Sequence, residues 1–225
     1  MLGSQSINNY ILIGCPGSGK GTLADEMSKY GYLKINTGDC LRSEVNNNTS
    51  LGIKIQKDLN EGIFISDQDV WESILPSLNN AIKSKQKFTL DAFPQNLGKL
   101  ELLKTFLKDN KLVNTVQFFI FRVDKSLALQ RIQGRLTCQN CTKVYNEISK
   151  KPKKALKCDH CCGTLIKRPE DNLNKSTERI ENFYNITAPI VGVIKRQFAS
   201  IDINSNINEN AIEKLSSNES ICQIK

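Results

Sequence analysis

The sequence predicts an α/β fold in which a parallel sheet is covered by helices on both faces. Three observations support this prediction. Short apolar runs of strand length alternate with longer stretches of helical spacing, which is typical of parallel sheets. A glycine-rich segment containing Lys20 directly follows the first apolar run, as in phosphate-binding loops. Four cysteines in two C-x-x-C pairs lie in one short stretch and indicate a small metal-bound module.

The expected strands and helices follow one another in a regular order. The segments that read as strands are residues 11–14, 33–36, 88–91, 116–121 and 201–203. The segments that read as helices are residues 19–30, 38–82 with breaks near 46–50 and 62–66, 126–135, 172–198 and 211–215. The polar tail after residue 216 is expected to be frayed.

Residues 14–22 are expected to bind phosphate between the first strand and the first helix. The glycines let successive N–H groups point inward, and the ammonium of Lys20 can reach a β- or γ-phosphate. The dipole of the following helix directs positive charge at the same anion. The match to G-x-x-x-x-G-K-[ST] is one residue off, because Gly21 stands between Lys20 and Thr22. The alternative is a glycine-rich turn that only connects strand to helix. The loop residues are Gly14, Cys15, Pro16, Gly17, Ser18, Gly19, Lys20, Gly21 and Thr22.

Composition and charge indicate a soluble enzyme with anionic ligands. A chain of 225 residues, 39% hydrophobic and 24% charged, can bury one core with small inserted modules. No apolar stretch approaches the length of about 20 residues that spans a bilayer. No basic leader precedes the phosphate loop, so we expect a cytoplasmic protein, with the mitochondrial matrix as the alternative. The net charge of +8 suits anionic substrates, although nucleic acid would suit it equally.

The cysteine spacing predicts one structural zinc site. Cys138 and Cys141 form one pair, and Cys158 and Cys161 form the other. Two such turns can offer four thiolates tetrahedrally to one zinc ion. Disulfides across such short gaps would be unusual in a reducing cytosol, so zinc is the favoured interpretation.

The remaining cysteines and the single histidine give weaker signals. Cys162 and His160 are close enough to be rival zinc ligands, although His160 reads better as a solvent-facing turn residue. Cys40 and Cys222 have no partner at ligand spacing. Cys15 lies near a helix N-terminus, but we expect a packed thiol there.

Several motifs occur together in a fixed order. They are the loop of residues 14–22, Asn36-Thr37-Gly38-Asp39 with Leu41-Arg42, Asp91-Ala92-Phe93-Pro94, Arg131-x-x-x-Arg135, the cysteine-bearing insert, and Arg168-x-Glu170-Asp171 with Arg179. In this order they resemble the adenylate kinase family, in the long form whose lid carries a structural zinc. The resemblance covers about residues 10–215. It implies a P-loop core of residues 1–36, 67–135 and 172–225, a helical monophosphate-binding insert of residues 37–66, and a hinged zinc-binding lid of residues 136–171.

The resemblance also implies roles for individual residues. Phosphoryl transfer between two nucleotides brings two polyanions together, so catalysis is mostly positioning and charge neutralisation. Lys20 and the loop amides hold the donor phosphates, and Thr22 and Asp91 hold Mg²⁺ through water. Arg131 lies over the donor base. The implied catalytic residues are Lys20, Asp91, Arg135, Arg168 and Arg179, and the ATP site comprises the loop residues with Arg131 and Arg135.

At the implied AMP site, Arg42 holds the acceptor phosphate and Thr37 contacts the base. The full implied set is Thr37, Gly38, Arg42, Ile63, Ile65, Ala92, Gln95, Lys99, Arg168 and Arg179.

The chain departs from the family pattern at this site. The family reads Asp-Gly-Phe-Pro-Arg, whereas this chain has Ala92 and Gln95 at the glycine and arginine positions. Where the family has a glutamine that reads the adenine edge, this chain has Lys99. If Gln95 and Lys99 share a helical face, the ammonium restores part of the lost charge but not a bidentate fork. The sequence therefore predicts a weakened enzyme or one with altered acceptor handling.

Three functions fit these residues, and the first is favoured. It is reversible phosphoryl transfer from ATP to AMP giving two ADP, with GTP as an alternative donor because the loop after Ile201-Asp202 lacks the family's glycine. The second is a catalytically silent nucleotide-binding protein. The third, a zinc-ribbon nucleic-acid binder, leaves the phosphate loop and the ordered arginines without a role. For the first function we expect a monomer that binds neither nucleic acid nor membrane.

Overall fold

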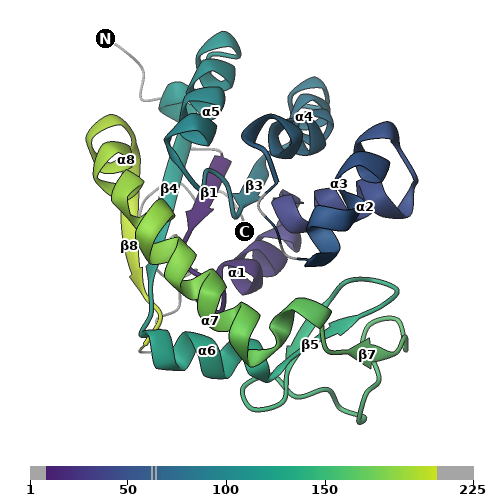
Figure 1. The fold of residues 1–225 in the computed structure, drawn as a ribbon. Coiled ribbons are helices and arrows are strands. Elements are labelled where there is room, and N and C mark those ends of the chain that lie inside the picture. Colours follow the sequence, from purple (N-terminus) through teal and green to yellow (C-terminus); the bar gives the residue numbers. More distant parts are fainter. Residues whose placement is uncertain (1–8, 62, 64, 207–225) are drawn as a thin grey trace.

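The central sheet has five strands that all run parallel. The structure, a computed structural model, describes residues 9–61, 63 and 65–206 (Figure 1). The strand order is β2 (Leu33–Asn36), β3 (Phe88–Asp91), β1 (Asn9–Ile13), β4 (Val116–Arg122) and β8 (Ala199–Asn204). Every neighbouring pair is parallel. The predicted α/β fold with a parallel sheet is confirmed, and the carboxyl ends of its strands meet along one edge.

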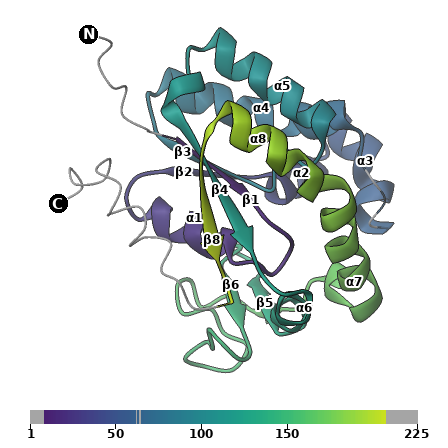
Figure 2. The same cartoon turned by 90° about the vertical axis from the view of Figure 1, so that its left-hand side faces the viewer.

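Helices cover both faces of this sheet. They are α1 (Lys20–Ser28), α2 (Thr37–Asn46), α3 (Ser50–Glu61), α4 (Asp67–Lys83), α5 (Leu97–Asp109), α6 (Lys125–Gln133), α7 (Leu173–Asn182) and α8 (Val191–Gln197). Successive side chains of a strand point to opposite faces of the sheet, so each strand contributes to an apolar layer on each face. Ile11 and Ile13 of β1 pack with residues of α4, α5 and α8. Tyr10 and Leu12 pack with residues of α1 on the opposite face. Figure 2 shows α1 on one side of the sheet and α4, α5 and α8 on the other.

Helices α2 and α3 form a hairpin beside the sheet (Figure 1). Gly52 allows their close approach, because a Cβ at this position would lie 2.0 Å from the main-chain oxygen of Glu44. Leu41, Leu51 and Ile55 of the hairpin are buried and join the cluster that contains Ile11. The hairpin is therefore held to the core by apolar packing.

Residues 135–166 form a separate small sheet. Its antiparallel order is β6 (Val144–Asn146), β5 (Arg135–Cys138) and β7 (Leu165–Ile166). Its buried residues are Leu136, Cys138, Tyr145, Cys158 and Leu165. Two of these five are cysteines, so the apolar core of the module is very small and a bound metal would add the missing rigidity.

The structure differs from the sequence prediction in several places. Helix α6 ends at Gln133, and Arg135 begins strand β5 instead of closing the helix. Helix α5 was not predicted, although Leu100, Leu103 and Leu107 are spaced to bury one face. The last strand is longer than predicted and extends over β8. The predicted helix at 211–215 and the tail after 216 lie outside the described residues.

The predicted helix over residues 172–198 is interrupted. A π-helical segment, Phe183–Thr187, and a 3₁₀ turn, Ala188–Ile190, separate α7 from α8. Pro189 lies in this turn and has no N–H to donate, which disfavours a regular α-helix there.

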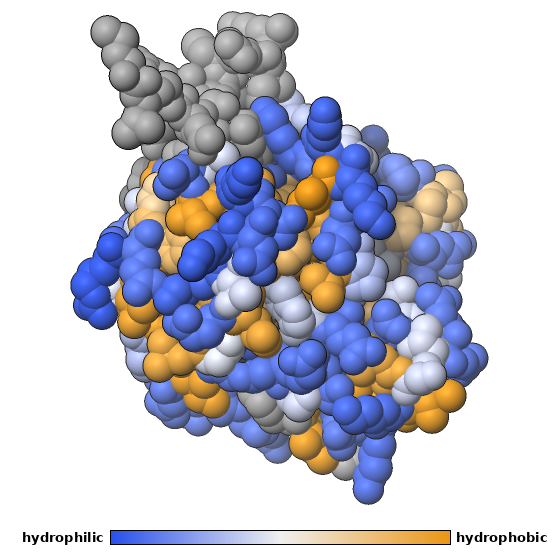
Figure 3. Space-filling view, turned by 90° about the horizontal axis from the view of Figure 1, so that it is seen from above, coloured by the Kyte–Doolittle hydropathy of each residue, from blue (hydrophilic) through white to orange (hydrophobic). Residues whose placement is uncertain are grey.

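The surface of the molecule carries no broad apolar area on the face shown in Figure 3, where apolar residues stand singly or in small groups among hydrophilic ones. Over the part of the chain that the structure describes, no helix combines the length and the hydropathy needed to cross a membrane.

Candidate active site

The phosphate loop joins β1 to α1 at the carboxyl edge of the sheet, and its shape requires glycine. Gly17 and Gly19 have φ values of 81° and 94°, in the left-handed region that side chains disfavour. A Cβ at Gly17 would lie 2.4 Å from the main-chain oxygen of Ala128. A Cβ at Gly14 would lie 2.8 Å from Cβ of Phe121. The close contacts at Gly14 and Gly17 and the positive φ values at Gly17 and Gly19 explain why the sequence places glycine at these positions.

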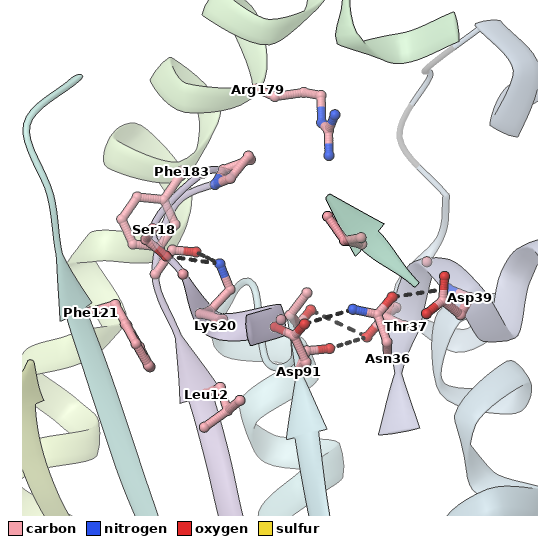
Figure 4. A pocket seen from close by; sticks show the side chains of 18 of the residues that line it. Leu12, Ser18, Lys20, Asn36, Thr37, Asp39, Asp91, Phe121, Arg179 and Phe183 are labelled. Atoms are coloured by element: carbon pink, nitrogen blue, oxygen red, sulfur yellow. Dashed lines mark hydrogen bonds between the residues drawn. The ribbon is translucent and has the colours of Figure 1, made fainter. Parts of the chain in front are cut away.

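Lys20 begins α1 and folds back into the loop. Its Nζ donates to the main-chain oxygens of Gly14 (2.6 Å) and Cys15 (2.9 Å) and to Oγ of Ser18 (3.2 Å), as Figure 4 shows in part. Burial lowers the pKa of Lys20, and the negative charge of Asp91 opposes this shift. A phosphate in the loop would add a second negative charge, which stabilises the ammonium form further.

Asp91 ends strand β3 and is buried beside the loop. Its Oδ2 accepts a hydrogen bond from Nδ2 of Asn36 at 2.7 Å (Figure 4). Its Oδ1 is also buried and accepts no hydrogen bond from the described residues. An unpaired buried carboxylate oxygen is costly without a cation, and oxygen is the ligand type that Mg²⁺ prefers. The residues present therefore fit a magnesium ion held near Asp91.

Two arginines, Arg135 and Arg179, bind one buried carboxylate, and a third, Arg168, lines the same cavity. The side chain of Asp171 is 1% exposed and accepts Nε of Arg135 at 2.7 Å, a second bond from Nη2 of Arg135, and Nη1 of Arg179 at 3.3 Å. Arg168 donates from Nε to Oγ1 of Thr137 at 2.9 Å. Figure 4 shows Arg179 reaching into the cavity from α7, on the side opposite Lys20.

The positive charges in this cluster repel one another. Burial, and after it the charges of Arg135 and Arg42, lower the pKa of Arg168 to about 10. Burial and then the charge of Arg135 lower the pKa of Arg179 in the same way. A polyanion between these groups would relieve the repulsion, so the cluster is preorganised for phosphate.

The end of the cavity near α2 carries a second cationic group. Nη2 of Arg42 lies 2.6 Å from Oδ1 of Asp39, and its Nη1 lies 3.6 Å from Oε1 of Glu170. Thr37 donates from Oγ1 to the main-chain oxygens of Asp91 and Ala92, at 3.2 Å and 3.3 Å.

Ala92 adopts a conformation that favours glycine. Its φ is 63°, and a left-handed conformation costs an L-residue about 1 kcal/mol or more. The structure thus retains a glycine-like backbone at the position where the sequence departs from the family pattern.

The side chain of Lys99 is held between Gln95 and Asp67. Its side chain is fully buried, and Nζ donates to Oε1 of Gln95 at 3.0 Å and lies 3.3 Å from Oδ1 of Asp67. Burial lowers the pKa of Lys99, and Asp67 opposes this shift. Gln95 precedes α5 instead of sharing its helical face, yet the two side chains meet. The carboxylate of Asp67 neutralises much of the positive charge of Lys99. Lys99 therefore replaces little of the charge that an arginine at position 95 would supply.

These groups line one cavity of about 900 Å³. The sequence-predicted residues that line it are Gly14, Pro16, Gly17, Ser18, Gly19, Lys20, Gly21, Thr22, Thr37, Gly38, Arg42, Ile63, Ile65, Asp91, Ala92, Gln95, Lys99, Arg131, Arg135, Arg168 and Arg179. Cys15 does not line the cavity. Its thiol is buried, and burial raises its pKa, in agreement with a packed thiol.

Sequence reasoning gave no role to three residues that shape this cavity. Asn36 holds Asp91, and Asp171 anchors two arginines. Ser205, after β8, donates from Oγ to the main-chain oxygen of Ser18 at 2.8 Å, and its own main-chain oxygen accepts Nη2 of Arg131 at 2.9 Å. For Asn36 and Ser205 the available signal was position, because polar residues at the carboxyl ends of parallel strands lie at the ligand-binding edge. Asp171 lies in a 3₁₀ turn and had no such signal.

The four cysteines predicted as metal ligands lie together. The Sγ atoms of Cys138, Cys141, Cys158 and Cys161 are all within 4.8 Å of one another. The rival candidates Cys162 and His160 are exposed and outside this group. The hydroxyl of Tyr145 lies 3.5 Å from Sγ of Cys158. Four sulfur atoms at this separation fit a tetrahedral zinc ion.

A parallel sheet, a phosphate loop after its first strand and arginines across the same cavity define a P-loop phosphotransferase. The family model for adenylate kinase matches residues 12–198. An adenylate kinase of Mesoplasma florum is 35% identical over 207 residues, which cover 91% of this chain and 95% of the relative. An adenylate kinase of Bacillus pumilus is 33% identical over 205 residues, covering 89% and 93%. The chain therefore belongs to the adenylate kinase family.

Proposed function

We propose that this chain catalyses reversible transfer of the γ-phosphoryl group of ATP to AMP, giving two ADP. The observation that carries the proposal is the single cavity that joins the phosphate loop to the α2 end, with arginines between them. A donor triphosphate in the loop and an acceptor monophosphate near Arg42 would bring their phosphates together at Arg135, Arg168 and Arg179. Membership of the adenylate kinase family supports the same assignment.

In the proposed mechanism, the chain positions and neutralises the two phosphates. The loop amides and Lys20 hold the β- and γ-phosphates of the donor, and Arg131 lies over its base. Arg42 holds the acceptor phosphate. Arg135, Arg168 and Arg179 stabilise the charge that spreads over the transferring group. Thr22 and Asp91 hold the magnesium shell, and bound Mg²⁺ would neutralise charge on the donor phosphates.

Base selection at the acceptor site is expected to be relaxed. The ammonium of Lys99 can only donate hydrogen bonds, and it already donates one to Oε1 of Gln95. The amide of Gln95 therefore has only its NH₂ group to offer to a bound base. Adenine requires an acceptor as well as a donor, whereas guanine and uracil present a carbonyl to donors. We therefore propose AMP as the acceptor with limited discrimination against GMP and UMP.

A matrix of donors and acceptors tests both the activity and this selectivity. ATP and GTP are assayed with AMP, GMP, CMP and UMP in a coupled assay, alongside calorimetric binding of each nucleotide. We expect ATP with AMP to be the fastest pair, with kcat/KM for AMP exceeding that for UMP or GMP by less than about 100-fold, far below the factor of 10⁴ or more that strict hydrogen-bond selection gives. A preference of that larger size would contradict relaxed selection.

A second candidate is a catalytically silent nucleotide-binding protein. Gln95 in place of an arginine favours it, because Lys99 is balanced by Asp67 and supplies little net charge. Tight nucleotide binding without turnover for any pair in the same matrix would select this candidate.

We also propose that the four-cysteine group binds one structural zinc ion. The prediction is that Cys158→Ser loses the zinc, because three sulfur ligands and a hydroxyl bind it far more weakly. Metal analysis should find stoichiometric zinc in the unaltered protein, and amide exchange in residues 135–166 should become faster in Cys158→Ser. Cys162→Ser is the matched control, since Cys162 is exposed and outside the group. Equal zinc in both variants would refute the site.

The proposed activity suggests a cytoplasmic monomer that acts without nucleic acid or membrane. A cytoplasmic location is supported by the paired cysteines, which need reduced thiols to bind zinc. Sedimentation of the purified protein, and nucleic-acid binding measured against salt concentration, test these expectations.

A further inference from the structure

The amide of Asn36 makes two hydrogen bonds in opposite directions. Asn36 ends strand β2, and its register partner in β3 is Asp91. Its Nδ2 donates to Oδ2 of Asp91 at 2.7 Å. Its Oδ1 accepts from the main-chain N–H of Asp39 at 3.0 Å and so caps the N-terminus of α2. Figure 4 shows both bonds as a continuous line from Asp91 through Asn36 to Asp39.

Each bond fixes the other because they share one planar amide. The cap determines where Oδ1 points, and Nδ2 must then lie on the other side of the amide, facing Asp91. The carboxylate of Asp91 has no second hydrogen bond from the described residues, since its Oδ1 is buried and unpaired. Among the described residues, the carboxylate therefore accepts one hydrogen bond, from Asn36. This bond sets the rotation of the Asp91 carboxylate.

We propose that Asn36 is a positioning residue that holds Asp91 in the orientation needed for the magnesium shell. The proposal rests on the proposed function, since it presumes a Mg²⁺–ATP donor near Asp91. Asn36 itself touches neither nucleotide nor cation in this scheme. Outer-shell partners of this kind usually change metal affinity by about tenfold or more.

The substitution Asn36→Ser separates the two bonds of the amide. Serine is as good an N-cap as asparagine, so α2 keeps its start. Its hydroxyl is one bond from Cβ, whereas the amide nitrogen is two bonds away, so the serine serves the cap and not the carboxylate. Asn36→Thr repeats the test with a residue that strand ends accept readily.

The chain offers a matched control at the start of α5. There Asn96 accepts the N–H of Lys99 on Oδ1 at 2.8 Å and donates from Nδ2 to Asp67 at 2.9 Å. Asn96→Ser thus makes the same substitution at the same helix position, with a carboxylate partner other than Asp91. Thermal melts establish that each variant is folded at the assay temperature.

The measurement is the affinity for ATP by calorimetry, with Mg²⁺ and with the metal removed. For the unaltered protein and for Asn96→Ser, we expect Mg²⁺ to strengthen ATP binding by the same factor. For Asn36→Ser and Asn36→Thr, this factor should fall roughly tenfold while metal-free ATP affinity is unchanged. An unchanged factor in both Asn36 variants would overturn the inference alone. No effect of Mg²⁺ on the unaltered protein would overturn the magnesium site of the proposed function and this inference with it.

Discussion

Replacing Arg135 with lysine is expected to lower kcat on the order of 10³-fold while the protein stays folded. Arg135 makes a two-bond contact with the buried carboxylate of Asp171 and lies within the same cavity as Lys20. Lysine retains the charge but not the planar fork, so it cannot hold Asp171 and bridge a transferring phosphoryl group at the same time. The measurement is steady-state kcat and KM with ATP and AMP, together with the midpoint of thermal unfolding.

Lysine is a sharper substitution than alanine here. Removing the charge altogether would leave Asp171, which is 1% exposed, with Arg179 as its one ion-pair partner among the described residues. Breaking a buried ion pair costs about 3–5 kcal/mol of stability. The matched control is Arg196→Lys, at an exposed position of α8. A loss in kcat of less than tenfold for Arg135→Lys, with an unchanged midpoint, would contradict a role for Arg135 in phosphoryl transfer.

The parts of the fold that the sequence predicted are those fixed by local sterics and by apolar periodicity. Gly17 and Gly19 must be glycine because of their positive φ values, and the apolar runs of β1 and β4 must be buried on both sides. The small sheet of residues 135–166 had no such signal. Its strands have two to four residues, which is too short for a period of two to be recognised.

The contacts that shape the site depend on tertiary structure. The ion pair of Lys99 with Asp67 joins residues far apart in the sequence, and only packing of α4 beside α5 brings them together. Of the adjacent acids Glu170 and Asp171, the fold buries one and leaves the other partly exposed, a distinction that residue type does not carry. The sequence therefore indicated which residues gather at the carboxyl edge of the sheet, but not which of them bind one another.

The second large effect is expected from Gln95→Arg, which should raise kcat with AMP at least tenfold. A preorganised donor at a transition state contributes about 10²–10³ in rate, and Lys99 supplies little of this because Asp67 balances its charge. The new guanidinium would take from Lys99 its acceptor, Oε1 of Gln95, and would place two cations side by side. The companion variant Gln95→Arg with Lys99→Gln removes this repulsion and should be faster still.

Gln95→Lys separates charge from geometry, since it adds a cation at the same position without a bidentate fork and should gain less than the arginine variant. Steady-state kinetics of the three variants with ATP and AMP give the comparison, and thermal melts show whether Asp67 tolerates the loss of its lysine. If kcat is unchanged or lower in both arginine variants, position 95 does not face the transferring phosphoryl group. In that case, the charge that this chain needs at the acceptor phosphate comes from Arg42 and the arginines around Asp171 alone.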